Sequence, residues 1–180
     1  MTRSSTAHGS RAARSDLFRL TTAALVAALV FLFTFLIKVP TVLGYIHLGD
    51  ALVLLYAATG DPLALVAGAL GEGLADLAGG YYQYIPATVL IKALIALPLV
   101  LGNRKQEAPE KKLLTRRNAL LSLPSVPITL GGYFIIDYLL GGAYAFTALG
   151  TNAVQAVGSL LVLAVLATAF DRSGMRDRLF

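Results

Sequence analysis

Two acidic residues stand one helical turn apart inside the strongly apolar stretch AGALGEGLADLAGGYY, residues 67–82. They are Glu72 and Asp76. Carboxylates placed in hydrocarbon are costly unless they are paired, protonated or in contact with water. Lys92 is the one deeply placed cation available to pair with them. These residues therefore predict either a buried ion pair that fixes helix packing or a polar interior with a gating role.

Polar side chains recur at helical spacing in three further apolar stretches. Tyr84, Thr88 and Lys92 are spaced four apart, so they share one helix face. Such stripes face a bundle interior or a wet cavity, because lipid does not solvate them. We expect Lys92, Asn152 and Gln155 to contact a water-soluble ligand. The other two stripes are Ser125, Thr129, Tyr133 and Asp137, followed by Asn152, Gln155 and Ser159.

The segment VPTVLGYIHLGDA, residues 39–51, predicts a short outer loop that could close over the cavity as a lid. Tyr45 and His47 are expected to be exposed there, and an ordinary interfacial role for His47 remains the alternative. Asp50 fits the N-cap of a second helix. The chain has no tryptophan, so Tyr45, Tyr84 or Tyr133 would supply an aromatic face for a ligand.

The amino-acid composition indicates the class of protein in which these residues are placed. Of the 180 residues, 57% are hydrophobic and 14% are charged, and the mean hydropathy is +0.72. These values are typical of an integral membrane protein. The absence of cysteine excludes disulfides and thiolate metal sites, and the two histidines do not suggest a metal centre. We therefore expect no metal and no cofactor.

The apolar segments predict an all-α integral membrane protein with six transmembrane helices. A helix needs about 20 residues to cross the hydrocarbon core, so the second segment is marginal. Residues 1–18 are expected to form a disordered basic tail, 19–172 the membrane domain and 173–180 a second tail. The six segments are residues 19–39, 43–59, 62–80, 84–102, 118–140 and 148–170.

The basic residues predict the orientation of the helices. All but Lys38 and Lys92 of the 15 lysines and arginines lie before or at the first residue of the first span, in the 103–117 loop or after the last span. Positive charge marks cytoplasmic segments, so both termini and this loop are predicted to be cytoplasmic. The same placement argues against nucleic acid as a partner.

Small residues recur at a spacing of four on two predicted helices. Such stripes let helix backbones approach closely. The stripe on the third helix is interpreted as packing within the chain, and internal packing is also an alternative for the first helix. The positions are Ala67, Gly71, Ala75 and Gly79 on the third helix, and the pairs Ala23/Ala27 and Ala24/Ala28 on the first.

Three stretches, GYIHLGDALVLL (44–55), GDPLALVAGALGEGLADLAGGYYQYIPATVLIK (60–92) and TNAVQAVGSLL (151–161), resemble the S components of energy-coupling factor (ECF) transporters of the riboflavin type. The resemblance implies a vitamin-capturing subunit of a prokaryotic plasma membrane. Its implied partners are a transmembrane T component and two cytoplasmic ATPases.

The resemblance also implies roles for particular residues. It places the ligand in the outer half of helices four to six, which makes Tyr84, Lys92, Asn152 and Gln155 binding candidates. It implies that one of the alanine pairs on the first helix docks the T component. It assigns no ligand role to Glu72 or Asp76.

Alternative functions remain open at this stage. The ligand could be riboflavin-like, or a ring resembling hydroxymethylpyrimidine or pyridoxine. A proton-coupled carrier would use Glu72, Asp76 and Lys92 as a relay, and an intramembrane enzyme would use Asp50 with another acid. No phosphate-binding loop is present, so ATP hydrolysis by that route is excluded.

Overall fold

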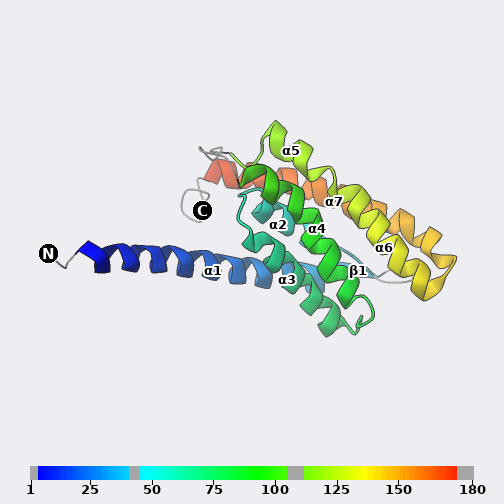
Figure 1. Cartoon of the computed structure of the whole chain (residues 1–180). Helices are drawn as coiled ribbons and strands as arrows, with labels where there is room; N and C mark the ends of the chain where they lie inside the picture. The colour runs from blue at the N-terminus through cyan, green and yellow to red at the C-terminus, as the bar shows by residue number, and fades with distance from the viewer. Residues whose placement is uncertain (1–3, 41–44, 105–111, 174–180) are drawn as a thin grey trace.

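The computed structural model describes residues 4–40, 45–104 and 112–173, with side chains from Ser15 onward (Figure 1). The chain is mostly helical, as predicted, but it also has an unpredicted antiparallel hairpin that pairs Lys38 with His47. The elements in chain order are α1 (Ser4–Leu36), β1 (Lys38–Pro40), β2 (Tyr45–His47), α2 (Gly49–Ala57), α3 (Leu63–Gly79), α4 (Ile85–Asn103), α5 (Arg116–Ser122), α6 (Ser125–Gly141) and α7 (Tyr144–Ser173).

Four helical stretches in the described part of the chain are long and apolar enough to cross a membrane. They are Ser15–Leu36, Ile85–Asn103, Arg116–Gly141 and Tyr144–Ser173. Many of their large apolar side chains point away from the bundle, as expected where the surrounding solvent is lipid. The protein is therefore a multi-pass membrane protein. The tail predicted over residues 1–18 differs from the structure, in which α1 is already helical at Ser4.

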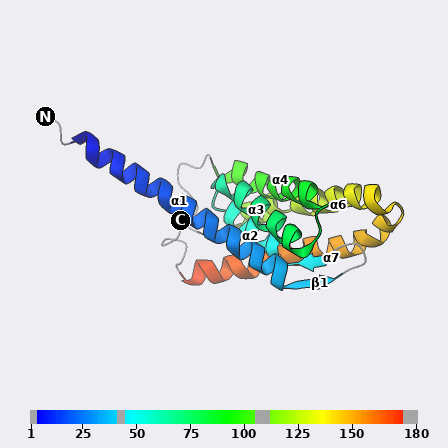
Figure 2. The same ribbon diagram turned by 90° about the horizontal axis from the view of Figure 1, so that it is seen from below.

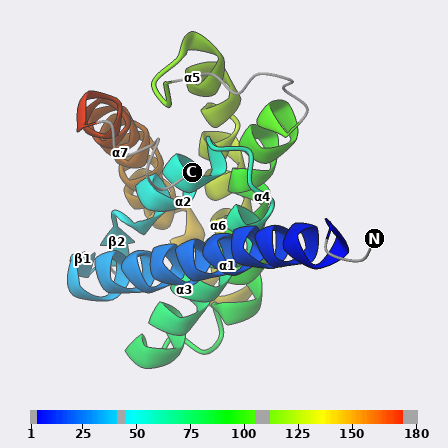
Figure 3. The same cartoon turned by 90° about the vertical axis from the view of Figure 1, so that its left-hand side faces the viewer.

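The prediction of a second transmembrane helix over residues 43–59 is wrong. The described part of this segment is divided between β2 and α2, a helix of only 9 residues. At 1.5 Å per residue, such a helix spans about half of the hydrocarbon thickness. It lies inside the bundle between α4 and α7 (Figure 3), contacts α1, α3, α4 and α7, and buries all its residues except Leu52. Its apolar composition reflects burial in protein rather than contact with lipid.

Helix α1 crosses the bundle obliquely and packs along α3 (Figure 2). The two backbones come close at Gly71, where a Cβ atom would lie 2.6 Å from the carbonyl oxygen of Ala27. The small-residue stripe of α3 therefore packs within the chain. Ala23 is buried and Ala27 half-buried on this side of α1, whereas Ala24 and Ala28 are exposed. The two alanine registers thus face in different directions.

Helix α1 begins and α7 ends at the same end of the bundle (Figure 1). Most of the described basic residues belong to the segments at this end, which is called the basic end. Polar contacts join its connecting segments. Asp171 accepts hydrogen bonds from the backbone N–H groups of Leu113 and Leu114, at 2.7 and 2.9 Å. Asn103 donates to the Asn118 side chain at 2.7 Å. The hairpin and the α3–α4 turn lie at the opposite end (Figure 1).

Candidate functional site

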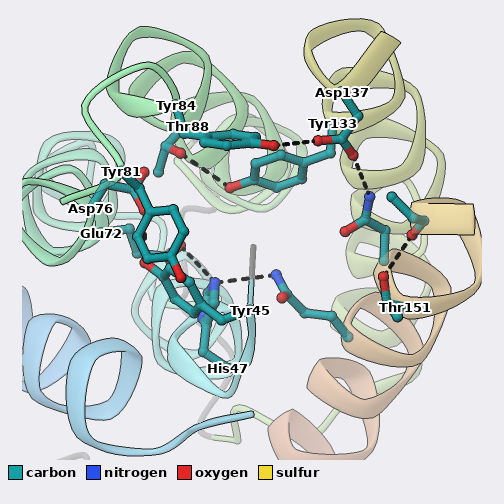
Figure 4. Close-up of a pocket in the computed structure, with 13 residues that line it drawn as sticks. Tyr45, His47, Glu72, Asp76, Tyr81, Tyr84, Thr88, Tyr133, Asp137 and Thr151 are labelled. Atoms are coloured by element: carbon teal, nitrogen blue, oxygen red, sulfur yellow. Dashed lines mark hydrogen bonds and ion pairs between the residues drawn. The ribbon is translucent and has the colours of Figure 1, made fainter. Parts of the chain in front are cut away.

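A cavity of about 50 Å³ opens among the helices at the end opposite the basic end (Figure 4). This volume holds only a few water molecules, so a vitamin-sized ligand requires lining side chains to move. The lining combines residues of the hairpin, α3, the α3–α4 turn, α4, α6 and α7. They are Tyr45, His47, Glu72, Asp76, Tyr81, Tyr84, Thr88, Tyr133, Asp137, Ala148, Thr151, Asn152 and Gln155.

Tyrosines form much of the cavity wall. The rings of Tyr45 and Tyr81 have centroids 4.9 Å apart, and those of Tyr81 and Tyr84 are 6.4 Å apart. Tyr133 faces them from α6, with its hydroxyl 3.3 Å from that of Thr88 (Figure 4). Tyr81 was not predicted as a site residue, although the run YYQY at 81–84 was a signal for an aromatic cluster. Together these rings can hold a planar ring ligand.

Two carboxylates lie on opposite sides of the cavity (Figure 4). Asp137 accepts hydrogen bonds from the Tyr84 hydroxyl at 2.8 Å and from Asn152 Nδ2 at 3.3 Å. Asp76 accepts one from the Tyr45 hydroxyl at 2.7 Å. Its other oxygen, Oδ2, has no hydrogen-bond partner among the described residues. Asp76 was expected to be structural or gating, and only its three-dimensional position reveals that it lines the cavity. We call Asp76, Asp137, Asn152 and the tyrosines of the lining (Tyr45, Tyr81, Tyr84 and Tyr133) the cavity wall.

A second group of charges lies beneath the cavity wall and is called the ion-pair layer. Lys92 Nζ lies 2.6 Å from Asp50 Oδ1 and 3.1 Å from Glu72 Oε2. All three side chains are at most 2% exposed. Gln155 extends the layer by donating to Asp50 Oδ2 at 2.9 Å. The layer thus ties α2 to α3, α4 and α7.

The position of Lys92 differs from the one expected for a ligand contact. It is absent from the described cavity lining, and its ammonium lies 5.1 Å from the ring centroid of Tyr133. The N-cap role predicted for Asp50 is wrong, because Leu48 is the N-cap of α2 and provides no side-chain cap. Asp50 instead lies in the first turn and pairs with Lys92.

His47 connects the two groups and is buried rather than exposed as predicted. The hairpin folds back over the cavity, which brings this ring to α3 and α7. Its Nδ1 accepts a hydrogen bond from the Gly49 N–H at 3.2 Å, which leaves the proton of a neutral ring on Nε2. Nε2 lies 3.3 Å from Glu72 Oε2. Gly49 is required here, because a Cβ atom would lie 2.0 Å from Thr34 Oγ1.

One described cluster has the donor set of a metal site. His47, Asp50 and Glu72 offer ligand atoms that lie within 4.8 Å of one another. The ammonium of Lys92 already contacts both carboxylates and supplies the compensating positive charge. The arrangement therefore accounts for these acids without a metal ion.

The fold and the cavity together define a multi-pass membrane protein with a small-molecule cavity at one end. The family model described as "ECF-type riboflavin transporter, S component" matches residues 16–172, more than half of the chain. The chain therefore belongs to this family of transport proteins, and the resemblance found in the sequence is confirmed. The family is one of transporter components rather than of enzymes. No match was found among curated proteins or among solved structures.

Proposed function

We propose that the chain captures riboflavin, or a related ring-containing vitamin or precursor, from the outer side of a prokaryotic cell membrane. The observation that supports this most strongly is the cavity wall, which combines a cluster of tyrosine rings with hydrogen-bonding side chains. Aromatic surfaces with a few placed polar groups are typical of sites for small cofactor-like molecules. Riboflavin itself is favoured because the matching family is described as a riboflavin transporter component.

The proposed direction of capture follows from charge. The connections and helix ends at the basic end carry Arg104, Lys112, Arg116, Arg117 and Arg172. Positive residues favour the cytoplasmic side of a membrane, so the cavity at the opposite end would open outward. Both termini would then be cytoplasmic.

The proposed partners are a T component and two ATPases, since the chain has no phosphate-binding loop of its own. The exposed alanine register of α1 is the candidate docking face. Ala24 and Ala28 are exposed and present a shallow, methyl-lined surface, whereas Ala23 and Ala27 face α3. Close helix packing on such surfaces is common in membranes.

The two alternative functions receive less support from the geometry. In a proton-coupled carrier, Lys92 would have to be available to exchange partners, but it contacts both Asp50 and Glu72. In an intramembrane enzyme, Asp50 would have to face a substrate, but it is 2% exposed and does not belong to the described cavity lining.

Binding and uptake measurements test the proposal together. The chain purified in mild detergent should quench riboflavin fluorescence on titration. Cells that express it should take up riboflavin only when a T component and its ATPases are also present. Uptake that persists without these partners and follows an imposed proton gradient would instead establish the carrier alternative.

The docking face has its own test. Ala24→Leu should sharply reduce uptake while binding by the purified chain and its thermal stability remain near wild type. Ala23→Leu is the matched control: overpacking against α3 should cost about 1–3 kcal/mol of stability. If Ala24→Leu leaves uptake unchanged in the complete transporter, α1 does not dock through this register.

A further inference from the structure

A second hollow, of about 520 Å³, lies on the exposed side of α7 near the basic end. It is separate from the cavity wall and from the ion-pair layer, and α7 stands at the edge of the bundle (Figure 3). The positions that line it share one face over the last three turns of the helix. The described lining is Ala164, Val165, Thr168, Ala169 and Arg172.

The hollow is apolar except at one end. The Thr168 hydroxyl donates to the Ala164 carbonyl at 2.7 Å, so it is not free to bind a ligand. Helix α7 has no charged residue before Asp171 and Arg172. The first charges of a membrane-spanning helix mark the level of the lipid headgroups. The hollow therefore lies beside lipid tails, with an arginine at headgroup level about 12 Å from its apolar end.

The guanidinium of Arg172 is available to an anion. It is exposed and has no ion pair with a described carboxylate. The adjacent Asp171 accepts hydrogen bonds from the backbone N–H groups of Leu113 and Leu114, at 2.7 and 2.9 Å. Lys112 precedes this contact and is also exposed, so a second cation belongs to the same edge of the bundle.

We infer that the hollow binds one anionic phospholipid, with an acyl chain along Ala164, Val165 and Ala169 and the phosphate against Arg172. The lining has the same polarity as such a lipid: it is apolar over two turns and cationic at the headgroup end. The planar fork of arginine suits a phosphate group. A soluble anion would leave the apolar part unused, and a lipid without net charge would leave the arginine uncompensated. This inference goes beyond the proposed function and does not depend on which vitamin is captured.

The absence of tryptophan from the chain allows a local test. Leu161 is 66% exposed, lies one turn before Val165 and is not in the described lining. Leu161→Trp therefore places a single fluorophore beside the hollow without filling it. The full chain is reconstituted in vesicles of phosphatidylcholine and phosphatidylglycerol, with the acyl chains of one lipid or the other brominated as quenchers. One basic side chain near the surface should enrich phosphatidylglycerol about fivefold at this position.

Two substitutions, each combined with Leu161→Trp, test the two parts of the site. Arg172→Gln should bring quenching by the two brominated lipids close to equality. Arg104→Gln, which removes another exposed arginine of the basic end, is its matched control and should leave the enrichment unchanged. Ala169→Leu fills the hollow and should also reduce the enrichment. Its control is Ala119→Leu, at an exposed position of α5 outside the described lining.

A second reporter, Leu101→Trp, separates a specific site from the general positive charge of the basic end. Leu101 is exposed on α4 and lies outside the described lining. Enrichment beside Leu161 that exceeds that beside Leu101, and that falls in Arg172→Gln with a wild-type unfolding temperature, supports the inference.

Four results overturn it. Equal quenching by both lipids beside Leu161 shows that no anionic lipid is held there, as when another segment of the chain covers the hollow. Equal enrichment at the two reporters shows general attraction to the basic end. Unchanged enrichment in folded Arg172→Gln removes the headgroup contact. Loss of the enrichment on adding inorganic phosphate at constant ionic strength assigns Arg172 to a soluble anion instead.

Discussion

The ion-pair layer and the cavity wall contain acids within the same bundle, but they compensate for them in different ways. In the ion-pair layer, Asp50 and Glu72 both contact the ammonium of Lys92. In the cavity wall, Asp76 and Asp137 accept hydrogen bonds from uncharged tyrosine and asparagine donors among the described residues. The first group thus compensates its acids with a cation, whereas the second uses neutral hydrogen-bond donors.

This difference separates structural charge from ligand-facing charge. A buried ion pair repays its desolvation cost only when both partners stay in place, so its residues are fixed. Carboxylates that accept hydrogen bonds from neutral donors keep an uncompensated negative charge. A third group, such as a ligand, can therefore still interact with that charge. The ion-pair layer therefore anchors the short helix α2, while the cavity wall remains available for recognition.

Lys92→Met gives the largest expected effect. Removing the cation leaves Asp50 and Glu72 buried without a charged partner, which typically costs about 3–5 kcal/mol. The variant should show a strongly lowered unfolding temperature in detergent, and any loss of ligand binding should follow from loss of fold.

The matched control is a triple variant that combines Lys92→Met with Asp50→Asn and Glu72→Gln. It removes both negative charges together with the cation, so it should recover much of the lost stability. If Lys92→Met alone folds as wild type and loses only ligand affinity, Lys92 belongs to the cavity wall and the distinction between the two groups fails.

Asn152→Ala has a smaller expected effect, on affinity rather than on stability. Asn152 donates to Asp137 at the cavity, so its loss changes the acceptor that a ligand meets. We expect binding to weaken by about tenfold, the effect of one lost or misplaced hydrogen bond. Unfolding should change little, because Asn152 is only half-buried. Loss of stability with unchanged affinity would place Asn152 among the structural residues.

Helical periodicity predicted which faces of the helices turn inward, but not the depth of each residue. The spacing of Tyr84, Thr88 and Lys92 correctly indicates one face, and all three side chains are buried. Only the first two reach the cavity. Lys92 lies one turn deeper, where it meets Asp50 on α2. Depth depends on where the ends of other helices fall, and local spacing carries no information about this.

The short helix α2 explains most of the other predictions that differ from the structure. Hydropathy does not distinguish a helix buried in protein from one in lipid, so residues 43–59 resembled a marginal span. Once this segment is a hairpin followed by α2, His47 moves inside and Asp50 reaches Lys92 across 42 positions of sequence. The family resemblance was more informative than periodicity here, since it rested on the order of several motifs.

The smallest expected effect concerns a charged pair outside both groups. At the basic end, Arg19 Nε and Nη2 donate to the Asp61 carboxylate at 3.0 and 2.9 Å, and the Arg19 side chain is 48% exposed. Burial raises the pKa of Asp61, but hydrogen bonds from Arg19 and the Leu63 N–H outweigh this and lower the pKa below its ordinary value. The pair therefore stabilises the fold above the unfolded pKa of about 3.9, and this contribution disappears as the pH falls through the lower folded value.

Asp61→Asn should accordingly cost about 1 kcal/mol or less at pH 7, because solvent screens an exposed pair. Thermal unfolding of wild type and variant should converge as the pH is lowered toward 3. This pair has better hydrogen-bond geometry than the Lys92–Glu72 contact, yet it should matter far less, because its loss leaves no charge stranded away from water. If Asp61→Asn lowers the stability as much as Lys92→Met does, the loss of a charged partner destabilises the fold equally at exposed and buried sites. The ion-pair layer would then have no structural role that distinguishes it from an exposed ion pair.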